Sequence, residues 1–212
     1  MSVADYMTKQ LVVVRPATTV SVAVTLMKEN DIHRLPVMDN NRMVGLITHG
    51  IIQRALPSQA TSLSVYETNY LLTKTTVDQI METSVQTVPA TAQLEDAIHA
   101  MRSHQIGVLP VMNGDQVVGI ITNNDILDAF LNLTDYGEPG VVTRVVVKHD
   151  HVGVIFDLGR VLAEHSFSIQ TLMVVNHGTE KVIELHVASD QAQPVNQVLT
   201  DAGFTIVPVT TR

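Results

Sequence analysis

Apolar residues recur at helical spacing in two separate stretches of the chain. The first stripe is Val20, Ala23, Val24 and Met27, and the second is Leu94, Ala97, Ile98 and Met101. Because residues three and four positions apart share one face of an α-helix, each stripe predicts an amphipathic helix.

The segments that follow the two stripes are also alike. A short apolar run with a proline comes first, and it predicts an edge or irregular strand because proline cannot donate to a ladder. Turn residues, a second apolar strand and a helical segment follow. The predicted strands are 35–38, 44–48, 109–112 and 118–122, and the helices after them are 49–56 and 123–131. Each copy is therefore predicted to run strand, helix, strand, strand, helix.

A nearly constant offset relates the two copies. The residues Met7, Met27, Pro36 and Gly45 recur 74 positions later as Met81, Met101, Pro110 and Gly119. One copy is too small to bury both faces of its sheet. We therefore expect an α/β fold of the α+β type, in which two repeats pack sheet to sheet about a pseudo-two-fold axis.

The last third of the chain has a different pattern, which begins after a Gly- and Pro-containing linker. The predicted elements are strands at 141–148, 169–175, 182–187 and 204–209 and helices at 154–162 and 194–202. Their order, βαββαβ, predicts a ferredoxin-like domain. The expected boundaries are 1–56 for repeat 1, 57–76 for a polar linker with a short helix around 65–72, 77–134 for repeat 2, 135–140 for a second linker and 141–212 for the last domain.

Composition narrows the function classes. The formal net charge is −8 and the basic residues form no run, so a nucleic-acid partner is not expected. The chain has no cysteine, which excludes disulfides, thiolate metal sites and a cysteine nucleophile. It shows no leader peptide and no apolar run long enough to span a membrane. These features favour a cytoplasmic protein.

The repeated Leu-Pro-Val-Met, the Gly-(apolar)2-Thr strand and Thr122-Asn123-Asn124-Asp125 at a helix start resemble a tandem pair of CBS domains, the Bateman module. The segments Val145-Val146-Val147 and Asp150-His151-Val152-Gly153 resemble the start of an ACT domain. A CBS pair followed by ACT is similar to the AcuB-type acetoin-utilisation proteins. The resemblance implies that the CBS pair binds a regulatory adenine nucleotide (AMP, ADP or ATP) or S-adenosylmethionine.

Thr122 and Asp125 are the strongest candidates for ligand binding. An ionised aspartate can accept hydrogen bonds from both ribose hydroxyls, and the free N–H groups of a helix start suit a phosphate. Thr-x-x-Asp at a strand-to-helix junction is also an ordinary capping box. The two interpretations can hold together. Repeat 1 has Thr48, but Ile51 stands where Asp125 stands, so we expect unequal sites with the second dominant.

By resemblance, an adenine base would lie in an apolar slot in each repeat. The slot of repeat 2 would be lined by Val88, Val108 and Pro110, and that of repeat 1 by Val14 and Pro36. The alternative for these residues is ordinary core. Arg34, which aligns with Val108, would either reach a nucleotide phosphate or be a solvated surface arginine.

In ACT domains the loop that matches Asp150–Gly153, together with residues near Ile169, contacts an amino acid at a dimer interface. The residues implied here are Asp150, Val152, Gly153 and Ile169. The alternative is a turn at a packing interface without a ligand. We expect a homodimer, because both domain types commonly pair with themselves and small symmetric assemblies dominate.

The histidine pairs His149/His151 and His99/His104 lack further ligands at metal-site spacing, so no metal is expected. Catalytic motifs are also missing. We therefore expect a regulatory sensor rather than an enzyme. The alternatives are a ligand-independent adaptor for a partner enzyme and, ranked last, a small enzyme acting on a nucleotide.

Overall fold

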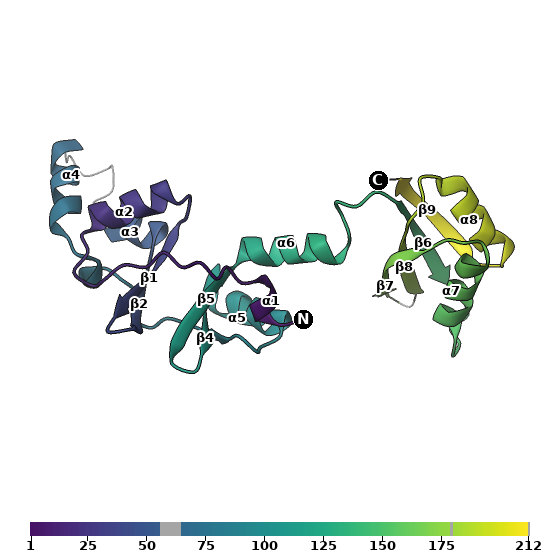
Figure 1. Ribbon diagram of the computed structural model, residues 1–212, viewed down its shortest axis with the longest axis horizontal. Coiled ribbons are helices and arrows are strands. Elements are labelled where there is room, and N and C mark those ends of the chain that lie inside the picture. The colour runs from purple at the N-terminus through teal and green to yellow at the C-terminus, as the bar shows by residue number, and fades with distance from the viewer. Residues whose placement is uncertain (56–64, 179, 212) are drawn as a thin grey trace. The chain divides into compact units, whose positions relative to one another are not determined.

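The computed structural model describes residues 1–55, 65–178 and 180–211 (Figure 1). The chain forms two compact units, Met1–Leu127 and Asp128–Arg212. The first unit holds both repeats, and the second holds the βαββαβ segment. The boundary between the units falls within helix α6 (Asn123–Leu133).

The first unit confirms most of the predicted elements. It contains α1 (Val3–Tyr6), α2 (Val20–Glu29), β1 (Arg34–Asp39), β2 (Arg42–Thr48), α3 (His49–Ala55), α4 (Val65–Lys74), the 3-10 helix η1 (Val77–Gln79), β3 (Val88–Pro89), α5 (Leu94–His104), β4 (Val108–Asn113) and β5 (Gln116–Thr122), and α6 follows. Repeat 2 has the full strand, helix, strand, strand, helix order. In repeat 1 the first strand is reduced to a single parallel bridge between Val14 and Val37.

The two apolar stripes face the core, as the sequence predicts. The buried residues of the two helices are Val20, Ala23 and Met27 on α2 and Leu94, Ala97 and Met101 on α5. The proline-containing strands are irregular, because the β1–β2 register shifts after Val37 and the β4–β5 register shifts after Val111. The irregularity thus falls at the same place in both repeats.

The leading segment of each repeat packs against the other repeat. Thr8 exchanges two backbone hydrogen bonds with Ile120, at 2.9 and 3.0 Å, and Glu82 exchanges two with Leu46, both at 2.9 Å. Thr8 and Glu82 occupy matching positions, and so do Leu46 and Ile120. The exchange is therefore symmetric, as the pseudo-two-fold axis requires.

Two glycines allow this exchange. A Cβ atom at Gly45 would lie 2.6 Å from the sulfur of Met81, and one at Gly119 would overlap the sulfur of Met7. Only glycine leaves room for the methionine at these positions. The same Gly–Met contact occurs in both repeats, and it accounts for two of the four residue pairs that repeat at the 74-residue offset.

The second unit is a four-stranded antiparallel sheet with two helices. Its elements are β6 (Val141–Val147), α7 (Val154–Glu164), β7 (Ile169–His177), β8 (Glu180–Val187), α8 (Ala192–Asp201) and β9 (Thr205–Thr211). The strand order is β7-β8-β6-β9. This order confirms the predicted ferredoxin-like arrangement.

Both helices of the second unit cover one face of this sheet (Figure 1). The core between them contains Leu158 and Leu162 of α7, Leu185 of β8 and Leu199 of α8, all fully buried. Burial of these large side chains is the main favourable contribution to the stability of the unit.

Candidate functional site

Thr122 and Asp125 meet where β5 ends and α6 begins. One carboxylate oxygen of Asp125, Oδ2, accepts the backbone N–H of Thr122 at 2.6 Å and the Thr122 hydroxyl at 2.7 Å. The backbone N–H of Asp125 donates in return to Thr122 Oγ1 at 3.4 Å. These contacts form a capping box, so the interpretation of Thr122 and Asp125 as a helix cap is confirmed.

The capping box leaves the other carboxylate oxygen of Asp125 largely uncommitted. Its Oδ1 atom accepts the Thr8 hydroxyl at 3.4 Å, which is long for an O–H···O bond. Thr8 comes from the leading segment that packs against β5. Asp125 is only half-buried, so Oδ1 is open to a ligand hydroxyl while Oδ2 continues to cap the helix.

Arg34 lies between the two repeats. A Cβ atom at Gly107 would lie 3.4 Å from Nη2 of Arg34, so the guanidinium packs beside that glycine. Burial lowers the pKa of Arg34 from its ordinary value, and the negative charge of Asp125 acts in the opposite direction. Arg34 is half-buried, so it is not a fully solvated surface arginine. Its role toward a ligand phosphate stays a prediction.

The matching site of repeat 1 opens into a cavity of about 590 Å³, which we call the first-repeat pocket. Thr48 and Ile51 line it from repeat 1, and residues 104–108 line it from repeat 2. The backbone N–H of Ile51 donates to Thr48 Oγ1 at 3.2 Å. This is half of the capping box seen at Asp125, because Ile51 has no side-chain acceptor to return the bond.

Basic side chains from both repeats line the first-repeat pocket. They are His33, Arg34, His49, Arg54 and His104. The rings of His33 and His49 meet edge to face, with 6.2 Å between their centroids. Among the described residues that line this pocket, Glu82 alone is acidic.

The residues predicted to hold an adenine base are mostly core. Val14 and Val88 are each 4 % exposed, and Pro36 and Pro110 are buried as well. Val108 is 7 % exposed and lines the first-repeat pocket from repeat 2. Its assignment to the second slot stays a prediction, as do the ligand-binding roles of the other four residues.

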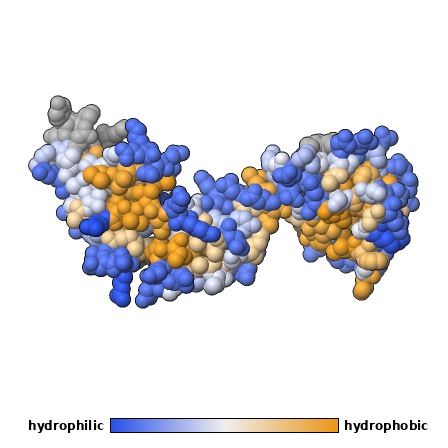
Figure 2. All heavy atoms as spheres, in the orientation of Figure 1, coloured by the Kyte–Doolittle hydropathy of each residue, from blue (hydrophilic) through white to orange (hydrophobic). Residues whose placement is uncertain are grey.

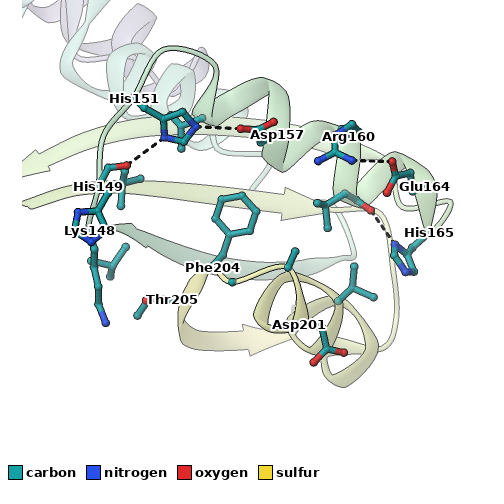
Figure 3. A pocket seen from close by; sticks show the side chains of 17 residues that line it. Lys148, His149, His151, Asp157, Arg160, Glu164, His165, Asp201, Phe204 and Thr205 are labelled. Atoms are coloured by element: carbon teal, nitrogen blue, oxygen red, sulfur yellow. Dashed lines mark hydrogen bonds and ion pairs between the residues drawn. The ribbon is translucent and has the colours of Figure 1, made fainter.

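The second unit contains a cavity of about 750 Å³ near α7, α8 and the start of β9 (Figure 3). Charged side chains surround Phe204, and several of them pair with one another. His151 Nε2 lies 3.0 Å from Asp157, and Arg160 lies 3.0 Å from Glu164. The hydrogen bond to Asp157 raises the pKa of His151 above its ordinary value.

The residues implied by the ACT resemblance are not among those that line this cavity. Asp150 pairs with Lys181, and Val152 is fully exposed at 104 %. Gly153 has φ +103° directly before α7, a backbone region that glycine adopts without strain. Ile169 begins β7 and packs against the core.

The structure also shows residues that sequence reasoning missed. Arg54 and His33 belong to the first-repeat pocket, and Thr8 contacts Asp125 from the other repeat. Within the described residues, no group of three or more potential ligands could hold a metal ion. A search of the same residues finds no helix with the length and apolarity needed to cross a bilayer.

A profile of the CBS domain matches residues 3–58 and 77–132, which together are more than half of the chain. MJ1225, an uncharacterized protein of Methanocaldococcus jannaschii, is 30 % identical over 179 residues. That match covers 80 % of this chain and 63 % of MJ1225, so the chain spans less than two thirds of that relative.

Two solved structures are also similar to this chain. An AcuB protein of Vibrio cholerae, assigned to acetoin utilization, has a TM-score of 0.54 and 30 % identity over 65 % of this chain and 95 % of its own. The CBS domain pair of protein MJ0100, solved with 5′-methylthioadenosine and S-adenosyl-L-methionine, has a TM-score of 0.53 and 25 % identity. It covers 62 % of this chain and 97 % of its own.

Proposed function

Because this chain belongs to the CBS-domain family, we propose that it is a regulatory sensor whose paired repeats bind an adenosyl ligand. The ligand is an adenine nucleotide (AMP, ADP or ATP) or S-adenosylmethionine. The observation that carries the proposal is the Oδ1 atom of Asp125, which accepts only a long hydrogen bond from Thr8 while the capping box uses Oδ2. The adenosyl compounds bound by the MJ0100 pair support the same ligand class.

Asp125 binds the ribose in this proposal, and Thr122 keeps it in place. The Oδ1 atom accepts hydrogen bonds from the ribose hydroxyls, which displace the long contact from Thr8. Arg34 supplies positive charge on the same side, since its guanidinium interacts electrostatically with Asp125. Because the Thr8–Asp125 contact joins the two repeats, a ligand that replaces it would bias the arrangement of the repeats.

The direct test is a thermal shift of the full chain with AMP, ATP and S-adenosylmethionine. A ligand that binds the native state must raise the melting temperature. Asp125→Asn keeps an oxygen for the cap but removes the charge, so it should weaken binding roughly ten- to a hundredfold. Asp96→Asn is the matched control, because Asp96 caps α5 through the backbone N–H of Gln93 at 3.0 Å.

Two results would contradict this function. If no adenosyl compound shifts the wild-type melting temperature, the chain is better described as a ligand-independent adaptor for a partner enzyme. If Asp125→Asn and Asp96→Asn reduce stability alike and leave the ligand-induced shift unchanged, Asp125 is a helix cap without a ligand role.

For the second unit, we propose an ACT domain that pairs with a second copy of the chain through the loop before α7. The ferredoxin-like strand order supports the domain type. Val152, Ile155 and Phe156 expose 104, 47 and 71 % of their surface around that loop. Figure 2 shows hydrophobic areas on the viewed face of this unit. Neighbouring exposed apolar side chains are typical of interaction surfaces.

Light scattering of the purified chain tests this second proposal. The wild type should be a dimer, and Phe156→Asp should shift it toward monomer because a buried carboxylate opposes association. Ala163→Asp, at an exposed position of the same helix, should leave the dimer intact. A wild-type monomer, or a Phe156→Asp dimer of unchanged stability, would refute the interface. An amino acid that tightens the dimer would identify the ligand of this domain.

A further inference from the structure

We propose that the cavity of the second unit binds an elongated zwitterion, a molecule whose carboxylate and ammonium groups are separated by an apolar chain. The residues that line this cavity come from the end of β6 and the loop after it, from α7, from the end of α8 and from the start of β9. The site is independent of the adenosyl site proposed for the repeats, because the two belong to different units.

The middle of the cavity is apolar. It is lined by Val154 and Val161 of α7, Val147 of β6, Val198 of α8 and Phe204. The first two are each 8 % exposed, and the other three are half-buried and pack against the core of the unit. Figure 3 shows the ring of Phe204 in the middle of the charged lining residues. An apolar chain that lies across these side chains loses contact with water, which favours its binding.

One end of the cavity carries an unpaired positive charge. Lys148 directly follows β6 and, among the described residues, forms no salt bridge. The acids nearest to it in sequence are already paired, Asp150 with Lys181 and Asp157 with His151. The helix α7 begins directly after this loop, so the positive end of its dipole lies there as well. Both charges favour a ligand carboxylate at this end.

The end of α8 carries an unpaired negative charge. Asp201 is the last residue of α8, and the last turn of that helix has no basic residue. An acidic side chain is unfavourable there, because the negative end of the helix dipole lies at the C-terminus. Asp201 Oδ1 accepts the side-chain amide of Gln197 at 2.8 Å, but Asp201 forms no salt bridge within the described part of the chain. A ligand ammonium here would neutralise the carboxylate and interact favourably with the dipole.

The other charged side chains of the lining neutralise one another. His151 pairs with Asp157 and Arg160 pairs with Glu164, each at 3.0 Å. A simple anion would therefore leave the acidic end of the cavity unmatched, and a simple cation would leave the basic end unmatched. Only a ligand with both charges satisfies the two ends.

The separation of the two ends sets the shape of the ligand. In Figure 3, Lys148 and Asp201 lie on opposite sides of Phe204. The cavity follows α7 from Val154 to Glu164, a helical length of about 15 Å at the usual rise per residue. An α-amino acid carries both charges next to one carbon atom, so it does not reach both ends. An ω-amino acid or a short apolar peptide with free ends has the required form.

The test is an NMR titration of the full chain with 6-aminohexanoate as the ω-amino acid and trileucine as the peptide. Binding should shift the backbone amide signals of residues 203–205, which line the cavity. Hexanoate and hexylamine each match one end only, so each should bind about two- to fivefold more weakly than 6-aminohexanoate, because exposed charges contribute modestly. Leucine, with both charges at one end, should also bind more weakly.

Two variants assign the ends. Lys148→Gln should weaken 6-aminohexanoate about two- to fivefold and leave hexylamine unchanged, and Asp201→Asn should weaken it equally and leave hexanoate unchanged. A general structural loss would not produce this crossed pattern. Asp190→Asn and Lys28→Gln are the matched controls, because both residues are exposed and neither lines the cavity.

The outcomes separate the two ligand sources and both proposals. Crossed dependence with 6-aminohexanoate alone identifies a small ω-amino acid, and the same dependence with trileucine identifies a peptide. The inference is overturned if neither ligand shifts the signals of residues 203–205. It is also overturned if leucine binds as tightly as 6-aminohexanoate, or if the variants weaken all ligands alike. Asp125→Asn should leave these titrations unchanged, so failure of the adenosyl site is measured separately.

Discussion

The two repeats of the first unit share a backbone but offer opposite chemistry at matching helix starts. In repeat 2, Asp125 completes a full capping box through Oδ2, and its Oδ1 accepts only a long hydrogen bond from Thr8. In repeat 1, Ile51 leaves half a cap, and the pocket around it is basic. Duplication thus gives both sites the same backbone, while differences at the helix start and in the pocket lining change the charge that a ligand meets.

The largest expected effect comes from exchanging the residues that distinguish the sites. Asp125→Ile should lower adenosyl affinity roughly ten- to a hundredfold, because the charged acceptor is lost. Ile51→Asp should give repeat 1 the full capping box, with a Thr48-to-Asp hydrogen bond like that of Thr122. Titration of both variants with adenosine checks the comparison. If Asp125→Ile binds adenosine with unchanged affinity, the assignment of the ribose contact to Asp125 is wrong.

A second prediction tests whether the repeats really share one backbone plan. Gly45→Ala and Gly119→Ala should each lower the free energy of unfolding by about 1–3 kcal/mol, because the added Cβ meets Met81 or Met7. Urea denaturation measures both losses. Adding Met7→Ala should recover part of the loss in Gly119→Ala only. If the two variants lose very different amounts of unfolding free energy, the Gly–Met contacts of the two repeats do not contribute equally to stability.

A smaller difference between the two sites is expected in how their ligand affinities depend on ionic strength. Raising the ionic strength from about 0.05 to 0.5 M shortens the Debye length, so it should weaken the attraction of a ligand phosphate to the basic side chains of the first-repeat pocket a few-fold. The ribose contact at Asp125 is a short-range hydrogen bond and should change less. Titration of ATP and adenosine at both ionic strengths tests this, and equal salt dependence for the two ligands would argue against a charge-based difference.

The smallest predicted effect lies in the second unit and serves as a negative control for both sites. The hydrogen bond to Asp157 raises the pKa of His151, so its slight stabilisation is present at low pH and is lost as the pH rises through the raised folded-state pKa. In NMR titrations, Asp157→Asn should lower the pKa of His151. The ligand affinity of the repeats should stay unchanged in this variant. A changed affinity would show that the two units are energetically coupled.

Regular, local features of the fold were predictable from the sequence. The stripes of α2 and α5 have helical periodicity, and the βαββαβ order follows from alternation and turn residues. The exchange of leading segments was not predictable. The offset between Met7 and Met81 is the same whether each segment packs on its own repeat or on the other, so only the three-dimensional contacts distinguish the two.

The candidate sites were predictable only in part, for a similar reason. Thr122 and Asp125 are three residues apart, so their contact follows from local helix geometry. The first-repeat pocket joins Arg54 to His104 across 50 positions of sequence. No periodicity links such residues, and their shared cavity arises from the packing of one repeat on the other.

The most direct measurement of the central difference is the stoichiometry of ATP binding to the full chain, followed by titration calorimetry. The account predicts two sites with distinct affinities, of which Asp125→Asn removes the tighter and leaves the weaker site of repeat 1. If Asp125→Asn leaves the isotherm unchanged, or weakens both binding events alike, the assignment of opposite chemistry to the two repeats is wrong.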